Sequence, residues 1–177
     1  MWARRPGFET LVRIILEQQV SLASAAAMHK RLLARTTTFT PRGFLRADEG
    51  HLKSLGVTRQ KTAYLIRLAE ALEDGTLDLK RVARADDPGA TAMLTRVKGI
   101  GPWTAQIYLL MALRRPDIWP TGDIALARAV RATKRLRTPP SPARLCRIAD
   151  AWRPYRSVAA RMLWQRYLAE RAQRRRA

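Results

Sequence analysis

The chain has 177 residues, of which 34 are Lys or Arg and 14 are Asp or Glu, so its formal net charge is +20. The hydrophobic fraction of 47% excludes a disordered tail protein, and the length suits one domain or two small lobes that share a cleft. The charge predicts a polyanionic partner or a strongly solvated surface, although a bias in genomic base composition also enriches arginine.

Few residues suit a cross-link, a metal site or a membrane segment. Cys146 is the single cysteine, which excludes an internal disulfide and a cysteine-ligated cluster. His29 and His51 are far apart in sequence, and we expect no metal site. Arg4-Arg5 precedes an apolar run as in a secretory signal, but polar residues interrupt that run, and no segment could span a membrane. The sequence predicts a soluble, cytoplasmic protein.

Helical periodicity dominates the first half of the chain. Helices are predicted over residues 8–19, 21–33 and 59–73, with a short one over 77–83. The first begins directly after Pro6-Gly7, and Ser21 is a plausible N-cap of the second. Residues 36–41 interrupt the helices, and residues 86–89 form a predicted turn.

The second half has the same character. Helices are predicted over residues 90–96, 102–113 and 143–151, with another starting near Asp123 and a last long one starting at Pro154. The last helix ends in the basic run Arg174-Arg-Arg176, which would add nonspecific affinity for a polyanion. No strand alternation or internal repeat is found, so the fold class is predicted to be all-α.

A sharp bend at Gly99-Ile100-Gly101 separates two of these helices. It exposes backbone amides at a helix start, where phosphate binds, and Lys98 and Thr104 add polar groups beside it. Thr104 could reach a phosphate or cap the helix. The pattern predicts a sequence-independent anchor for a nucleic-acid backbone. An ordinary helix–helix corner explains the two glycines equally well.

Asp123 follows about twenty residues after the bend, in Thr121-Gly-Asp123, and opens a periodic apolar run. Its position is that of a helix N-cap, which is one complete explanation of the residue. The other is a catalytic acid presented by a DNA-binding hairpin. Asp117 is the competing carboxylate, but it lies in an irregular link rather than at a helix start.

Four segments, in order along nearly the whole chain, resemble one protein family. They are Phe8–Ser21, Gly56–Thr62, Val97–Ala105 and Trp152–Ser157, the last leading to Leu163-Trp164. Val97-Lys-Gly-Ile-Gly-Pro-Trp-Thr-Ala105 resembles the hairpin of the helix-hairpin-helix DNA glycosylase superfamily, and the other segments resemble its 3-methyladenine (alkylation-repair) branch. The resemblance implies a two-lobed helical domain with a DNA-facing cleft, and base excision repair by hydrolysis of the N-glycosidic bond of a flipped-out damaged base.

The resemblance also implies a role for single residues at the reaction centre. Asp123 matches the family's catalytic aspartate, and one carboxylate suffices because it can stabilise the oxocarbenium character of the sugar and orient water. Alkylated purines are positively charged and leave readily. Bifunctional members carry a nucleophilic lysine where this chain has Trp103, so we expect a monofunctional enzyme without lyase activity.

Further roles follow from the same resemblance. Trp103, Trp164 and Ile107 would line the base pocket, and Ile107 departs from the aromatic residue of some relatives. Gln19 would be the wedge that fills the gap left by the flipped base, although a polar helix end is the simpler explanation. The remaining DNA contacts are predicted at Lys98, Gly99, Gly101, Thr104, Arg59, Lys61, Arg153 and Arg156, although charged runs are often only solvated faces.

The resemblance also concerns cofactors, the chain ends and partners. No cofactor or iron–sulfur cluster is expected, apart from a structural monovalent cation at the carbonyls of Thr95, Val97 and Ile100. Residues 1–177 would form one domain without the N-terminal sheet domain of some relatives. Because the chain begins almost inside the first motif, it is expected to be either a minimal form or one truncated at its N-terminus, with an upstream helix missing. The protein is expected to be monomeric and associated with the nucleoid, and its expected partner is double-stranded DNA with damaged bases. A catalytically silent DNA-binding module and a basic nucleoid or ribosomal protein are the competing hypotheses.

Overall fold

The computed structural model of the chain describes residues 3–35, 38–46, 52 and 54–173. His51 and the Arg174–Arg176 run lie outside these residues. The described part is helical and contains no strand, so the predicted all-α class is confirmed. Its helices are α1 (Phe8–Glu17), α2 (Leu22–Arg35), α3 (Pro41–Arg46), α5 (Arg59–Glu73), α6 (Leu79–Arg84), α7 (Asp87–Thr95), α8 (Pro102–Met111), α9 (Ile124–Thr133), α10 (Pro142–Asp150) and α11 (Arg156–Gln173).

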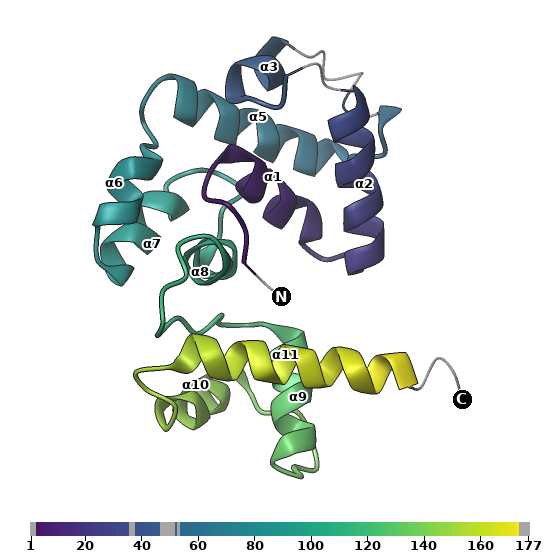
Figure 1. The fold of residues 1–177 in the computed structure, drawn as a ribbon, viewed down its shortest axis with the longest axis vertical. Helices are drawn as coiled ribbons and strands as arrows, with labels where there is room; N and C mark the ends of the chain where they lie inside the picture. The colour runs from purple at the N-terminus through teal and green to yellow at the C-terminus, as the bar shows by residue number, and fades with distance from the viewer. Residues whose placement is uncertain (1–2, 36–37, 47–51, 53, 174–177) are drawn as a thin grey trace.

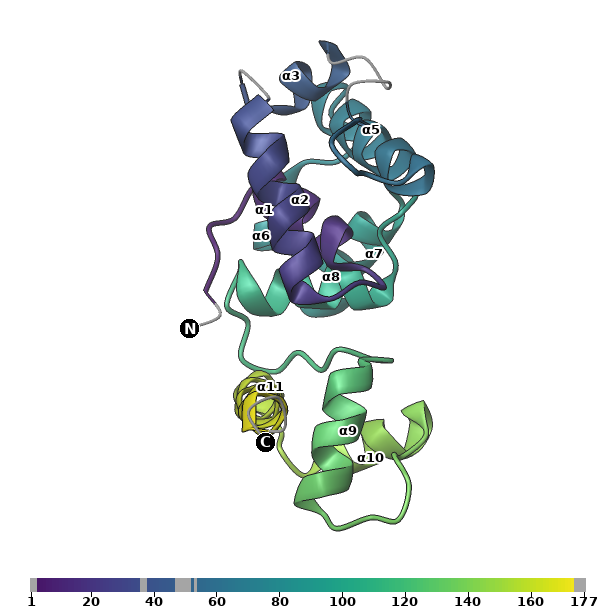
Figure 2. The same cartoon turned by 90° about the vertical axis from the view of Figure 1, so that its right-hand side faces the viewer.

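The helices form two lobes, as the resemblance implies. Helices α1 to α8 make the larger lobe, and α9, α10 and α11 make the smaller one, with the segment between α8 and α9 crossing from one to the other (Figure 1). The view turned by 90° shows the same division, with α8 on the side of the larger lobe that faces α11 (Figure 2). Residues far apart in sequence therefore meet where α8 faces the second lobe.

Two helices carry most of the core of the larger lobe. In α1, Leu11 to Leu16 are fully buried except Arg13, and the helix packs against α2, α5 and α8. In α8, every residue from Ile107 to Met111 is buried. A helix that is apolar on all sides must lie inside a protein. The composition of α8 thus explains why it lies between the other helices and the second lobe.

Local capping explains most helix starts. Ser21 accepts a hydrogen bond from the Ser24 amide (3.1 Å), which confirms it as the cap of α2. The predicted turn at residues 86–89 is wrong, because α7 already begins at Asp87. The Asp86 carboxylate caps it by accepting from the Gly89 amide (2.9 Å), and Pro88 fits a first helical turn. The last helix begins at Arg156 rather than at Pro154.

One short helix was not predicted from the sequence, whereas the predicted absence of a membrane-spanning segment can be checked directly. Residues 41–46, directly after the interrupting segment, form the short helix α3, whose Phe44 is fully buried. Among the described residues, no helix has the length and apolar character needed to cross a membrane.

Candidate active site

The glycine bend lies between α7 and α8, as predicted. Gly99 has a φ of 100°, and a Cβ there would collide with the ring of Tyr64 on α5, so only glycine fits. Gly101 is the N-cap of α8 and supplies no side-chain cap bond. The side chain of the N-cap residue therefore leaves the first backbone N–H groups of α8 without a partner, and an anion can accept hydrogen bonds from them. Lys98 is exposed beside the bend.

The side chain of Thr104 does not make the predicted phosphate contact. It is 2% exposed, and its hydroxyl accepts a hydrogen bond from Nε2 of Gln18 (2.9 Å). The hydroxyl therefore faces the protein interior and does not reach a phosphate. Only the backbone amide of Thr104, in the first turn of α8, stays available for the predicted contact.

Asp123 is the N-cap of α9, and its carboxylate collects hydrogen bonds from three elements. Oδ1 accepts from the Leu126 amide (2.8 Å) and from the indole Nε1 of Trp164 (3.3 Å), and Oδ2 accepts from Nε1 of Trp103 (3.0 Å). Both carboxylate oxygens are thus engaged by N–H groups from α8, α9 and α11. The N-cap interpretation is confirmed, and the same carboxylate lies where the two lobes meet.

The two tryptophans predicted as pocket walls are both at Asp123, but they are also part of the packing. Trp164 is 7% exposed and belongs to the hydrophobic core. Trp103 is half-buried and packs against that core. Ile107 is 2% exposed and lies inside the core. The structure therefore brings Trp103 and Trp164 to the carboxylate, while Ile107 is a core residue.

A hollow of about 490 Å³ lies between the lobes. Its walls come from α7 and α8 on one side and from α10, α11 and the connecting segment on the other, and they include Thr95, Pro102, Thr121 and Cys146. Asp123 and the two tryptophans do not line it. The described residues thus form an inter-lobe cleft, but its hollow part is not the site of the carboxylate.

The end of α1 lies against the glycine bend. Nε2 of Gln18 donates to the Gly99 carbonyl (2.9 Å) as well as to Thr104. Gln19, the predicted wedge, is exposed and has a φ of 56°, in the left-handed region that side-chain-bearing residues rarely adopt. Its exposure agrees with a side chain that enters DNA, and its role as wedge stays a prediction. The sequence offered no signal for the Gln18 contacts.

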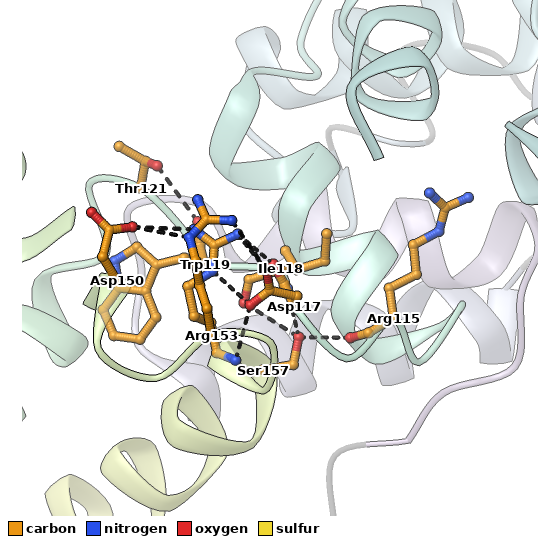
Figure 3. Close-up of polar contacts among 9 residues, drawn as sticks. Arg115, Asp117, Ile118, Trp119, Thr121, Asp150, Arg153 and Ser157 are labelled. Carbon is orange, nitrogen blue, oxygen red and sulfur yellow. Dashed lines mark hydrogen bonds and ion pairs between the residues drawn. The ribbon is translucent and has the colours of Figure 1, made fainter. Parts of the chain in front are cut away.

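Asp117, the competing carboxylate, is committed to an ion pair. Arg156 donates from Nε to Oδ1 (2.7 Å) and from Nη2 to Oδ2 (2.9 Å) and to the Asp117 carbonyl (2.8 Å). These hydrogen bonds hold the pKa of the Asp117 carboxyl below its ordinary value. Beside it, Ser157 accepts from the Ile118 amide (2.9 Å) and donates to the Arg115 carbonyl (2.6 Å), so the group joins the connecting segment to α11 (Figure 3).

This arrangement corrects the predicted DNA contact of Arg156, whereas that of Arg153 stays a prediction. Arg156 is largely buried, with 18% of its side chain exposed, and its guanidinium is occupied by Asp117, so it is not available to a phosphate. Arg153 is more exposed but pairs with Asp150 (3.2 Å) and Asp117 (3.4 Å) (Figure 3). Arg156 attaches the start of α11 to the connecting segment, and Arg153, which precedes α11, links the same segment to the end of α10.

Comparison with known proteins identifies the family. Residues 12–154 match the family model described as the HhH-GPD superfamily base excision DNA repair protein. The chain belongs to the HhH-GPD superfamily. The superfamily inferred from the glycine bend is thereby confirmed.

Relatives of known structure place this HhH-GPD protein in the predicted branch. It shares 30% sequence identity with the DNA-3-methyladenine glycosidase of Bacillus halodurans, covering 96% of this chain and 81% of that one, with a TM-score of 0.79. The 3-methyladenine DNA glycosylase of Schizosaccharomyces pombe, solved with abasic DNA, has 26% identity over 91% of this chain and 84% of that one, with a TM-score of 0.85.

Curated relatives agree, but most are longer. The chain is 32% identical over 176 residues to DNA-3-methyladenine glycosylase 2 of Escherichia coli, covering 91% of this chain and 59% of that protein. It spans 58% and 56% of two similar Bacillus subtilis relatives. Because the chain spans less than two thirds of these relatives, the activity of this HhH-GPD protein does not follow from their names alone.

One more predicted contact of the HhH-GPD protein is wrong, and one stays a prediction. Lys61 is 7% exposed, and its ammonium donates to the carbonyls of Leu16 (2.6 Å) and Gln18 (2.8 Å) at the end of α1, so it does not contact a phosphate. Burial lowers the pKa of the Lys61 ammonium. Arg59, the first residue of α5, is exposed, and its contact with DNA is untested.

Proposed function

We propose that the protein is a monofunctional DNA glycosylase that hydrolyses the N-glycosidic bond of flipped-out alkylated purines, of the 3-methyladenine and 7-methylguanine type. The observation that carries the proposal is the Asp123 carboxylate, held between two indole N–H groups and the first turn of α9 at the meeting of the lobes. The names of the relatives support the same activity, and the description of the family supports a role in base excision DNA repair. The expected substrate is double-stranded DNA with damaged bases.

In the proposed reaction the hairpin positions DNA and Asp123 acts on the sugar. Backbone amides at the start of α8 donate hydrogen bonds to a phosphate without reading the base sequence, and the exposed Lys98 adds a cationic contact. As the bond between C1′ and the base nitrogen breaks, its electron pair neutralises the positively charged purine, and cationic character develops on the sugar. The carboxylate of Asp123 stabilises this charge. Water then adds its oxygen to C1′ and loses a proton, leaving an abasic site.

The proposal includes the absence of strand cleavage. A lyase needs an amine that attacks C1′, and the residue at that place in α8 is Trp103, whose indole donates to Asp123. The buried ammonium of Lys61 is engaged by the end of α1, far along the chain from the carboxylate. Hydrolysis by water is therefore the reaction that this set of side chains favours.

The base pocket is proposed at the faces of Trp103 and Trp164, beside the carboxylate. Both indoles direct their N–H groups to Asp123, so a purine stacked on the half-buried ring of Trp103 would have its glycosidic bond close to the carboxylate, with Trp164 packed behind as the buried wall. Ile107 lies behind them in the core and shapes the pocket only through packing.

Several parts of the proposal concern partners and ions. The protein would act as a monomer in the compartment that holds the chromosome. No organic cofactor is proposed. A monovalent cation would be held by the carbonyls of Thr95, Val97 and Ile100, since carbonyl oxygens suit hard cations. The bend at Val97, whose carbonyl accepts from the Ile100 amide (3.0 Å), keeps two of these residues close together.

The decisive experiment compares two N-cap variants. Asp123→Asn keeps a good cap but removes the carboxylate, and Asp78→Asn is the matched control, because Asp78 caps α6 in the same way. Each protein is incubated with methylated duplex DNA, and released bases are identified by chromatography. We expect 3-methyladenine or 7-methylguanine from the wild type and from Asp78→Asn, and none from Asp123→Asn, which still binds DNA. Binding without base release by the wild type would favour the silent DNA-binding module instead.

A further inference from the structure

One face of α5 contacts both of the segments that the proposed function brings to DNA. Lys61 lies under the end of α1, where its ammonium donates to the Leu16 and Gln18 carbonyls. Tyr64, three residues later and on the same side of the helix, lies against Gly99 in the hairpin. A single rigid helix thus supports the loop that carries Gln19 and the bend that carries the free amides.

A second link joins these two segments directly. The amide of Gln18 donates from Nε2 to the Gly99 carbonyl and to the Thr104 hydroxyl, at 2.9 Å each. The backbone carbonyl of Gln18 is itself held by Lys61. Gln18 is therefore fixed at both ends, by α5 through its main chain and by the hairpin through its side chain.

Gln19 follows immediately, and its side chain makes no hydrogen bond or ion pair with the described part of the chain. Its φ of 56° is unfavourable for a residue with a side chain, and its side chain is exposed. A left-handed residue persists when its neighbours determine the path of the chain. Here the neighbour on its N-terminal side is clamped by Lys61.

We propose that Lys61 is a positioning residue for DNA opening: by holding the carbonyls of Leu16 and Gln18, it fixes Gln19 in the conformation that fills the gap left by a flipped nucleotide, at a set distance from the hairpin. The proposal rests on the function proposed above. Lys61 touches neither DNA nor the reacting atoms. Its contribution is confined to substrates whose lesion must first be taken out of a paired stack.

A buried ammonium is well suited to this task. The last carbonyls of a helix lack intrahelical partners and carry the negative end of its dipole, so a cation there satisfies them and is satisfied in turn. A neutral side chain of the same length would leave two buried carbonyls without that donor. The loop would then be free to relax the left-handed residue, and the wedge would leave its place.

The test compares Lys61→Met with Lys80→Met, whose lysine is exposed on α6. Single-turnover base release is measured on a duplex with 7-methylguanine paired to cytosine and on the same strand with the lesion unpaired in a bulge. Flipping costs least for an unpaired base, so a wedge defect appears only on the paired duplex. We expect Lys61→Met to lose about 10- to 100-fold on the paired duplex and less than about twofold on the bulge.

Two further measurements keep the proposal open to refutation. Gln19→Ala should show the same substrate-dependent loss, and the double variant should lose no more than either single one, since both act through one group. Lys61→Arg should restore part of the paired-duplex rate. Equal losses on both substrates, or full additivity with Gln19→Ala, would assign Lys61 a purely structural role and overturn the proposal.

The remaining outcomes are also decisive. If Lys61→Met does not fold, Gln18→Met breaks the hairpin side of the same clamp and is judged by the same comparison. If the wild type releases no base, the proposed function fails, and positioning is then tested by binding alone. For this a duplex carries 2-aminopurine beside the 7-methylguanine. Wild-type protein should raise its fluorescence and Lys61→Met should not, whereas equal increases would refute the positioning role.

Discussion

The ion pair between Asp117 and Arg156 allows the two candidate acids of this protein to be separated by one pair of substitutions. Asp117→Asn keeps the shape of the side chain but removes its charge. Both groups are largely buried, with 20% and 18% of their side chains exposed, so solvent does not screen the pair fully. We therefore expect Asp117→Asn to lower stability without touching the reaction.

The size of the effect follows from the contacts. The Arg156 guanidinium makes two hydrogen bonds to the carboxylate oxygens and one to the Asp117 carbonyl, and the Arg156 backbone amide adds a longer one to Oδ1 (3.3 Å). Only the bond to the carbonyl is unaffected by the substitution. An asparagine can accept one of the two at neutral strength, and its NH₂ group opposes the other. Hydrogen bonds to charged groups contribute about 1.5–3 kcal/mol against about 1 kcal/mol for neutral ones, so the loss is about 2 kcal/mol. For a chain of 177 residues this lowers Tm by about 4–8 °C.

The assay is thermal unfolding followed by circular dichroism, together with base release at 25 °C, where the variant is still folded. Asp150→Asn is the matched control, because Asp150 pairs with Arg153 on the surface, with 56% and 55% of the side chains exposed. Such a pair contributes little, and Tm should change by less than about 2 °C. Asp123→Asn should lose base release, which Asp117→Asn keeps, and its Tm should fall as well, because the asparagine NH₂ opposes one of the N–H donors that surround the carboxylate.

Two results would refute this reasoning. A Tm of Asp117→Asn equal to that of the wild type would mean that the ion pair contributes nothing to folding. Loss of base release by folded Asp117→Asn, with release kept by Asp123→Asn, would make Asp117 the catalytic acid. The Tm values thus test the contribution of the ion pair to stability, and base release separately tests which carboxylate is the catalytic acid.

Four further predictions concern the pH dependence of the ion pair, the hairpin and the hydrogen bonds of the carboxylate. The pKa of Asp117 is lowered in the folded protein, so its contribution to stability is complete above the ordinary value of 3.8 and is lost as pH falls through the folded pKa. The Tm difference between wild type and Asp117→Asn should therefore be constant from about pH 5 to 8 and shrink below about pH 4. Gly99→Ala, which strains a φ of 100° and collides with Tyr64, should weaken DNA binding more than tenfold in a fluorescence titration, and unchanged affinity would argue against the hairpin anchor. Lys98→Ala should reduce the slope of log K against log salt by about 0.9, and an unchanged slope would exclude a phosphate contact. Trp103→Phe keeps an aromatic ring but removes the N–H donor to Asp123. It should slow base release by about tenfold in single-turnover assays while DNA affinity is kept. An unchanged rate would show that this hydrogen bond does not position the acid.

The sequence was sufficient for the parts of the fold that depend on local signals. Apolar periodicity found the long helices, Ser21 and the glycine bend behave as capping rules predict, and the order of motifs identified the superfamily. The start of α7 was missed although Asp86 and Pro88 are a normal helix beginning, because an Asp-Asp-Pro-Gly run is equally typical of a turn.

The candidate site was predictable only in part, because charge does not reveal where a side chain points. Lys61 and Arg156 were both assigned to phosphate, yet one caps the end of α1 and the other is paired with Asp117. Both partners lie more than thirty residues away in sequence, the Leu16 carbonyl at one end of the larger lobe's first helix and Asp117 in the connecting segment. Contacts of that range follow from the tertiary fold and have no local signature.

The two interpretations of Asp123, helix cap and catalytic acid, describe one geometry rather than two competing roles. The bond from the Leu126 amide to Oδ1 holds the Asp123 side chain over the first turn of α9, so the helix itself orients the carboxylate. The indoles of Trp103 and Trp164 fix its remaining freedom from the two neighbouring helices. A carboxylate on a loop would need other contacts to hold it within the fraction of an ångström that catalysis requires. Capping provides that precision in a small domain, and it is also why the acid looks structural when only its sequence is known.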